Sequence, residues 1–343
     1  MRKHEISFLN TVLCLLVMFI HICSAAVGGL QKESLQFGII FLPWRLSAFV
    51  VQGFLFLSAL KFFRGMKDEF HYGAFLWSRI RKIGIPYVIA TVLSYFGLIY
   101  LGYYCFDLRF LLQSLTLGNM ISPFYFIIIL FQFYVLMPVW RKMVEKVDFW
   151  VMAVAGVLLM RLFHQGLPSM IALISPDAVF PYNDRVFTSY LAYWVLGCYA
   201  GKYYDAFCEG VEKNHKIILS GFVVFLLADG LFAYANTRGW MWVSFLEDIH
   251  TLYVFSAILA FYWLGMRQSE WFFRIPGMKA IDRLSFYIYL YHGIWLYFVQ
   301  DRLLNPIGIG LSAGFVIRWL LCWGGAFVAA WAVAFWKKKG EKV

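Results

Sequence analysis

The chain has 343 residues, of which 62% are hydrophobic, 21% are aromatic and only 14% are charged, and its formal net charge is +11. A soluble domain of this length cannot bury so much apolar surface, so the composition excludes a soluble globular protein. The excess of basic residues is explained by charges that flank membrane spans and meet anionic lipid, so no nucleic-acid partner is expected.

About ten apolar stretches follow one another, each near the ~20 residues that a helix needs to cross a bilayer. They are residues 6–26, 38–60, 83–102, 122–140, 149–165, 186–204, 217–236, 250–266, 284–304 and 312–336. The first stretch resembles a signal peptide, but its cleavage site is weak and further spans follow directly, so we expect a retained helix. The sequence therefore predicts an all-α fold, a polytopic membrane helical bundle forming one membrane-embedded domain over residues 1–343.

The basic residues are unevenly distributed between the two sides of this predicted bundle. Of the 30 Lys and Arg residues, 22 lie in the segments 2–3, 61–82, 141–146, 202–216, 267–283 and 337–342. Lys and Arg favour the cytoplasmic side, and an even number of spans places both termini on one side. We therefore expect a multi-pass protein of the cell membrane, in contact with membrane lipid, with both termini cytoplasmic.

The cysteines and histidines give no sign of a metal site. The six cysteines are scattered without CxxC spacing, and no two of the seven histidines stand at a ligand interval. Neither a bound metal nor a disulfide framework is expected.

His21 is an ionisable residue within the first apolar stretch, and such residues are candidates for function because a span disfavours them. Asn10, Cys14 and His21 recur at helical intervals and share one face. We expect Asn10 near the cytoplasmic end and His21 in the outer third of the span. The alternative is that His21 is a polar clamp that serves only packing.

His292 is the second such histidine, in the ninth predicted span. Ser285 and Tyr289 precede it by seven and three residues and share its helical face. The alternative is again a polar brace between helices.

Arginines are predicted in the outer third of three different helices, at Arg45, Arg161 and Arg318. Acidic residues and a histidine belong to the same predicted layer: Asp229, Glu247, Asp248 and His250. A single arginine near a helix end usually extends to the interface. Three of them with acidic partners could line an outward-facing polar cavity that binds a sugar or a phosphate.

On the opposite side, Arg79, Arg81 and Lys82 stand just before a helix start marked by Pro86. Cations beside a span normally determine topology. Arginine also binds phosphate through two parallel hydrogen bonds, so a phosphate-rich cytoplasmic ligand could dock there.

Together these residues resemble the acyltransferase-3 family of integral-membrane proteins, which includes surface-polysaccharide O-acetyl and O-succinyl transferases. The resemblance covers about residues 5–335 and depends on an ordered set of motifs. They are His21, Phe54-Leu-Phe-Leu-Ser58-Ala59, Arg79 to Tyr87, Tyr125-Phe126 through Tyr134-Val-Leu-Met-Pro138, Tyr193-Trp-Val-Leu-Gly197, and Ser285-Phe-Tyr-Ile-Tyr289-Leu-Tyr-His292. Two positions depart from the family: Asn10 stands where a basic residue is common, and Ala59 replaces the usual glycine.

The resemblance implies transfer of an acyl group, most commonly acetyl and next succinyl, from cytoplasmic acyl-CoA to a hydroxyl of an extracytoplasmic or lipid-linked glycan. Arg79, Arg81 and Lys82 would then bind the CoA phosphates. Imidazole suits general-base catalysis near neutral pH, and we expect this role for His21 because of its predicted depth. His292, supported by Tyr289, would orient the thioester carbonyl or stabilise the oxyanion. Asn10, Arg45, Arg161, Arg318 and Asp229 would contact the acceptor.

Two other functional classes remain open. A transporter or exporter of a glycan or small organic acid could use the same arginines and histidines as a substrate path, although no internal repeat is evident. The membrane-bound O-acyltransferase superfamily also uses a buried histidine, but the ordered motifs fit it less well. The chain could also form a homo-oligomer.

Overall fold

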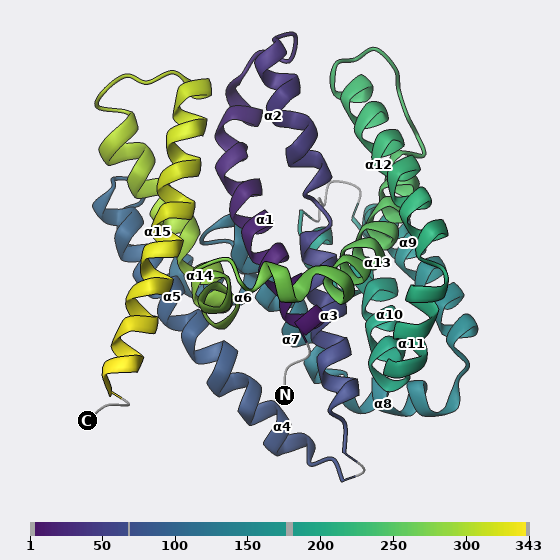
Figure 1. The fold of residues 1–343 in the computed structure, drawn as a ribbon. Coiled ribbons are helices and arrows are strands. Elements are labelled where there is room, and N and C mark those ends of the chain that lie inside the picture. Colours follow the sequence, from purple (N-terminus) through teal and green to yellow (C-terminus); the bar gives the residue numbers. More distant parts are fainter. Residues whose placement is uncertain (1–3, 68, 176–180, 341–343) are drawn as a thin grey trace. The chain divides into compact units, whose positions relative to one another are not determined.

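The computed structural model describes residues 4–67, 69–175 and 181–340, and every regular element in these ranges is helical (Figure 1). The predicted all-α fold is therefore confirmed. The chain folds into two compact units: residues 1–50, 100–103 and 210–343 form the first, and residues 51–99 and 104–209 the second. Arg2, Lys3 and Lys342, which entered the charge count, lie outside the described residues.

Six helical segments among the described residues are long and apolar enough to cross a membrane. They are His4–Gly29 (α1), Leu35–Arg64 (α2 and α3), Tyr72–Tyr100 (α4, η1 and α5), His215–Thr237 (α12), Leu246–Phe272 (α13) and Leu311–Val328 within α15 (Leu311–Gly340). A seventh is counted if α6 (Leu108–Leu117) and the segment Ser122–Val135, bent by 50°, form one span. The chain is thus a multi-pass helical protein, and the count of about ten spans remains a prediction.

All ten predicted stretches are helical, but some are divided. The segment 122–140 consists of η2 (Ser122–Phe124), α7 (Tyr125–Val135) and α8 (Met137–Lys146), because the chain turns at Leu136. The segment 186–204 begins with the 3₁₀ turn η4 (Phe187–Tyr190), so its α-helix is short. The remaining elements are α9 (Phe149–Ile174), η3 (Asn183–Arg185), α10 (Leu191–Lys202), α11 (Tyr204–Lys213), α14 (Met278–Val299) and η5 (Gln300–Leu304).

In the first unit α1 is the central helix, since it packs against α2, α13, α14 and α15. A helix surrounded in this way can be apolar on every side, and α1 buries residues around its whole circumference. Its approach to α13 depends on Gly265, where a Cβ atom would lie 3.0 Å from the Phe8 ring and 3.1 Å from the Glu5 carbonyl oxygen. α1 therefore holds the unit together and positions any polar residue on its surface against a neighbouring helix.

The predicted span 38–60 is broken between α2 (Leu35–Leu46) and α3 (Val50–Arg64). The Ser47 hydroxyl donates a hydrogen bond to the Pro43 carbonyl oxygen, four residues earlier, at 2.8 Å. Such a bond tends to bend a helix. The Leu46 carbonyl, which loses its helical partner at the break, accepts a hydrogen bond from the Tyr253 hydroxyl of α13 at 2.5 Å. The break leaves Arg45 in the last turn of α2.

In the second unit α10 packs closely on α3 through Gly197 and Gly201. A Cβ atom at Gly197 would lie 2.4 Å from the Phe56 carbonyl oxygen, and one at Gly201 would lie 2.5 Å from that of Leu60. Small residues four apart let two helix backbones approach in this way. Two sequence motifs thus meet, and Gly197 leaves room for the Cβ atom of Ala59.

The basic motif before Pro86 contains a π-helical turn, η1 (Ile80–Gly84), between α4 (Tyr72–Arg79) and α5 (Ile85–Tyr100). Proline clashes with the carbonyl four residues earlier and donates no hydrogen bond. A π-turn widens the helix at such a point, and these turns are frequent at functional sites.

Candidate functional site

His21 of α1 and His292 of α14 lie side by side in the first unit. Their ring centroids are 5.2 Å apart, with 44° between the ring planes. His292 is 5% exposed and His21 is half-buried. The two histidines that stand out in the sequence are therefore one structural site, which the sequence did not reveal because they are on distant helices.

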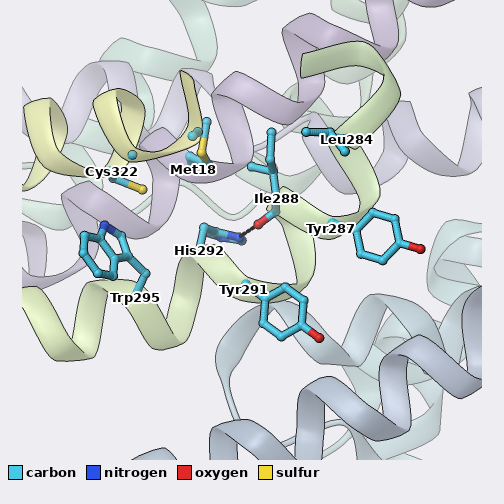
Figure 2. Close-up of a pocket in the computed structure, with 10 residues that line it drawn as sticks. Met18, Leu284, Tyr287, Ile288, Tyr291, His292, Trp295 and Cys322 are labelled. Carbon is cyan, nitrogen blue, oxygen red and sulfur yellow. Dashed lines mark hydrogen bonds between the residues drawn. The ribbon is translucent and has the colours of Figure 1, made fainter. Parts of the chain in front are cut away.

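The hydrogen bonding of His292 determines which of its nitrogens can react. Its Nδ1 lies 3.0 Å from the Ile288 carbonyl oxygen, and a carbonyl only accepts, so Nδ1 carries the proton of the neutral ring (Figure 2). Nε2 then carries a lone pair. This atom is buried and has no hydrogen-bond partner among the described residues. A fixed tautomer with an unprotonated, buried Nε2 is the arrangement of a proton acceptor.

A cavity of about 530 Å³ adjoins His292 between α1, α14 and α15 (Figure 2). It is lined by Met18, Leu284, Tyr287, Ile288, Tyr291, His292, Trp295, Cys322, Gly325 and Ala326. This volume lies in the range of small-molecule sites. Next to the cavity, the Tyr289 ring has its centroid 6.3 Å from that of His292 and stacks on Phe286. Tyr289 therefore packs beside the catalytic candidate, as its spacing indicates.

Asn10 joins α1 to α14 further along the same interface. Its Nδ2 donates to Asp282 Oδ1 and to Ser285 Oγ, both at 2.9 Å, and the Cys14 thiol lies 3.7 Å from the Ser285 carbonyl oxygen. The shared faces of Asn10, Cys14 and His21 on α1 and of Ser285 and His292 on α14 thus contact each other. The order of these contacts makes the two helices run in the same direction.

Asp282 is a site residue that the sequence reasoning missed. It is 8% exposed and accepts a hydrogen bond from Asn10. At position 10, where the resemblance noted from the sequence leads one to expect a basic residue, an amide is thus the donor to a buried carboxylate. Asp282 could have been identified from the sequence, because it stands three positions before Ser285 and therefore lies on the same helical face.

Arg45 and Asp229, both predicted to contact the acceptor, form a buried ion pair. Arg45 donates from Nε to Asp229 Oδ2 at 3.1 Å and from Nη2 to Oδ1 at 2.8 Å. His250 Nδ1 lies 3.1 Å from the same Oδ2, and the Glu247 carboxylate lies 3.9 Å from Arg45. Asp229 is fully buried and both its oxygens are engaged, so its role is to hold the guanidinium of Arg45 in place.

Beside this pair lies a second cavity of about 330 Å³. It is lined by Val27, Lys32, Phe37, Phe41, Trp44, Arg45, Ala233, Thr237 and Leu246. The two cations among aromatic rings suit a ligand with apolar faces and an anionic or hydroxyl-rich edge.

The other two arginines of the predicted outer layer have different surroundings. Arg318 is 3% exposed and donates from Nη1 to Gln300 Oε1 at 2.8 Å, while its Nε and Nη2 are buried with no partner among the described residues. Arg161 lies on α9 in the second unit. Arg45 and Arg318 thus have separate partners, and Arg45 alone of the two lines the second cavity.

The basic motif lies in the second unit and is itself heterogeneous. The guanidinium carbon of Arg79 lies 5.0 Å from the centroid of the Phe75 ring and 5.4 Å from that of Tyr134. Arg81 and Lys82 are exposed in the π-turn η1. The stacked Arg79 is preorganised, and the other two cations are accessible to a soluble anion.

Comparison with known proteins agrees with this architecture. A family model described as an acyltransferase domain matches residues 3–336. The chain is 26% identical over 342 residues to a Bacillus subtilis (strain 168) protein provisionally named membrane-bound acyltransferase YfiQ, covering 97% of this chain and 92% of that protein. It is 23% identical over 364 residues to a Staphylococcus epidermidis protein provisionally named poly-beta-1,6-N-acetyl-D-glucosamine export protein, covering 92% of each. No solved structure gives a significant match.

Proposed function

Because the chain belongs to the acyltransferase 3 family, whose domain matches residues 3–336, we propose that it transfers an acyl group from acyl-CoA to a hydroxyl of a cell-surface or lipid-linked glycan. One observation carries the proposal: His292 lines a cavity, its ring lies beside that of His21, and its Nε2 is buried without a hydrogen-bond partner among the described residues. Such an atom is suited to take a proton from an alcohol.

The proposed step is direct transfer. The acceptor oxygen attacks the thioester carbonyl carbon, and its proton passes to His292 Nε2. The tetrahedral intermediate then collapses with cleavage of the C–S bond, and the departing thiolate takes the proton from His292. The products are the ester and free CoA, and the protein returns to its starting state.

The roles of the two histidines follow from the tautomer. Neutral His292 has no proton on Nε2 to offer an oxyanion, so the base fits His292 better than the oxyanion role expected for it from the sequence. His21, with its ring 5.2 Å away, is then the donor to the developing oxyanion. Tyr289 packs beside His292 and positions its ring.

The donor phosphates are assigned to Arg79, Arg81 and Lys82. Exposure of Arg81 and Lys82 and the stacked guanidinium of Arg79 support this assignment. In the proposed orientation this motif and both termini are cytoplasmic, as the distribution of basic residues favours.

For the acceptor, we assign the cavity beside Arg45. Lys32 and Arg45 supply hydrogen-bond donors, Trp44 supplies a flat apolar face, and Asp229 fixes the guanidinium. Asn10 supports this site only indirectly, by holding α1 on α14. Arg161 and Arg318 remain candidate acceptor contacts.

Mass spectrometry of surface glycans from cells with the native chain, a deletion or single variants tests the proposal. We expect the acyl mass increment to disappear on deletion. His292→Gln should lower transfer by about 10²–10⁴-fold, the usual contribution of a general base. His21→Ala should lower it by about 10²–10³-fold, as loss of an oxyanion donor does, and His21→Gln should retain part of the rate because it keeps an N–H donor.

His215→Gln is the matched control, since His215 stacks on Trp263 outside the site. It should leave the increment unchanged. Near-normal transfer by His292→Gln together with loss in His21→Gln would return the base to His21.

Glycan export is the second candidate function, favoured by the name of the Staphylococcus epidermidis relative. The same cells discriminate between the two. An acylation pattern that is unchanged on deletion, with glycan retained inside the cell, would support export and overturn the transferase.

A further inference from the structure

The cavity beside His292 is almost entirely apolar. Its walls are Met18 of α1, several aliphatic and aromatic residues of α14, and Cys322, Gly325 and Ala326 of α15. Apart from His292, the polar atoms of the lining side chains are the Tyr287 and Tyr291 hydroxyls, the Cys322 thiol and the Trp295 indole N–H, which donates to the Leu321 carbonyl oxygen at 3.3 Å. Neither the hydroxyls of a sugar nor the phosphates of CoA would find partners here, and burying them unpaired is unfavourable.

The size of the cavity also matters. An apolar cavity of about 150 Å³ already holds a benzene-sized molecule, and this one measures about 530 Å³. An acetyl group would fill a small part of it. A hydrocarbon chain of several carbons fits both the volume and the lining.

The position of His292 in the cavity wall indicates which molecule would supply this hydrocarbon chain. A chain lying in the cavity with its carbonyl at the His292 end would place the reacting carbon beside the His292 ring. We propose that the cavity binds the hydrocarbon part of the transferred acyl group, so that the protein prefers acyl-CoA donors with a longer apolar chain over acetyl-CoA. This inference rests on the proposed function and adds its donor class.

Two neighbouring glycines of α15 provide a test and its control. Gly325 lines the cavity, and a Cβ atom added there would make ordinary contact with Trp295 Nε1 at 3.5 Å. A Cβ atom at Gly324 would meet nothing within 4 Å. Gly325→Leu therefore narrows the cavity, whereas Gly324→Leu adds the same side chain outside it. Ala326→Val is a milder second variant of the lining.

The full-length protein in proteoliposomes, supplied with a glycan acceptor and acetyl-, butyryl-, hexanoyl- or octanoyl-CoA, gives the first measurement. Release of CoA should show kcat/KM rising about fourfold per added methylene, the factor that corresponds to burying one CH₂ group. Gly325→Leu and Ala326→Val should flatten this rise while keeping turnover of the shortest donor. Gly324→Leu should behave like the native chain.

Binding gives a second measurement that does not depend on turnover. Cys322 lies in the cavity wall, so a variant with the other five cysteines replaced by alanine reports occupancy through alkylation by a membrane-permeant maleimide. Octanoyl-CoA should slow labelling of Cys322, and acetyl-CoA should not. Equal protection by both donors, or kcat/KM independent of chain length, would overturn the inference.

The outcomes separate this inference from the function on which it rests. No CoA release with any donor would contradict the transferase itself. Turnover of acetyl-CoA at an undiminished rate, with Gly325→Leu raising only the KM for a lipid-linked acceptor, would assign the cavity to the acceptor's lipid tail and refute the acyl-chain site.

Discussion

Asn10 of α1 donates a 2.9 Å hydrogen bond to the carboxylate of Asp282 on α14. The same amide donates to Ser285. Both contacts lie on the interface that, further along, brings His21 to His292. The register of α1 on α14, and with it the geometry of the histidine pair, depends on this polar junction.

Asn10→Leu removes both hydrogen bonds from a buried interface. We expect the midpoint of thermal unfolding of the detergent-solubilised protein to fall. The free energy of unfolding should decrease by about 1–3 kcal/mol, because buried polar groups lose a partner. Asn10→Lys should retain stability, since an ammonium group can donate to Asp282 as the amide does. Instability of the lysine variant equal to that of the leucine variant would contradict this account.

The Arg45–Asp229 pair should show strong coupling. Asp229→Ala leaves a mostly buried guanidinium without its two carboxylate contacts, and we expect a loss of about 3–5 kcal/mol in a chemical unfolding series. The double variant Arg45→Met/Asp229→Ala should recover part of that loss because no unpaired charge remains. Additive effects of the two substitutions would show that the residues do not act as a pair.

Gly197 permits the contact between α10 and α3. Gly197→Ala places a Cβ atom 2.4 Å from the Phe56 carbonyl oxygen, so one helix must move. We expect a clear drop in unfolding temperature and in the amount of folded protein recovered from membranes. Gly210→Ala on α11 is the control, since its Cβ atom would meet nothing within 4 Å. Equal behaviour of the two variants would refute the close packing.

Helix positions and shared faces could be predicted from the sequence because both depend on local periodicity. The faces of α1 and α14 meet as their spacing indicates, and the first-helix residues Asn10 and His21 contact the same partner helix. The break after Leu46 could not be foreseen, since the tyrosine that accommodates it comes from α13. Arg45 and Arg318 were predicted in one layer. Their hydrogen-bond partners, Asp229 and Gln300, could not be predicted because they depend on how separate helices pack.

In the basic motif, the exposed residues Arg81 and Lys82 should contribute to CoA binding separately from the stacked Arg79. The double variant Arg81→Gln/Lys82→Gln should be inhibited less strongly by free CoA, with a loss of about 1.5–3 kcal/mol of binding free energy for each lost charge-assisted contact. Lys213→Gln/Lys216→Gln, which replaces the last residue of α11 and a basic residue in the first turn of α12, is the control and should leave CoA inhibition unchanged. Unaltered inhibition in the Arg81/Lys82 variant, once its insertion is verified, would leave these cations as determinants of topology only.

The proposed orientation can be measured with single cysteines in a chain that lacks its native ones. Lys67, Lys213 and Lys32 are all exposed, so each accepts a label without repacking. In intact cells an impermeant thiol reagent should modify a cysteine at position 32 and spare those at 67 and 213. The reverse pattern would place the basic motif outside the cell and exclude a cytoplasmic donor there.

Arg318 makes one hydrogen bond and keeps two buried nitrogens without a partner among the described residues. Each such donor lowers stability by about 1–3 kcal/mol, so a residue chosen for folding alone would not be arginine. Selection for thermal robustness without regard to activity should therefore replace Arg318 by an apolar residue such as methionine. Selection that also demands activity should retain the arginine, and the two experiments together would measure how much stability this protein gives up at a position it needs.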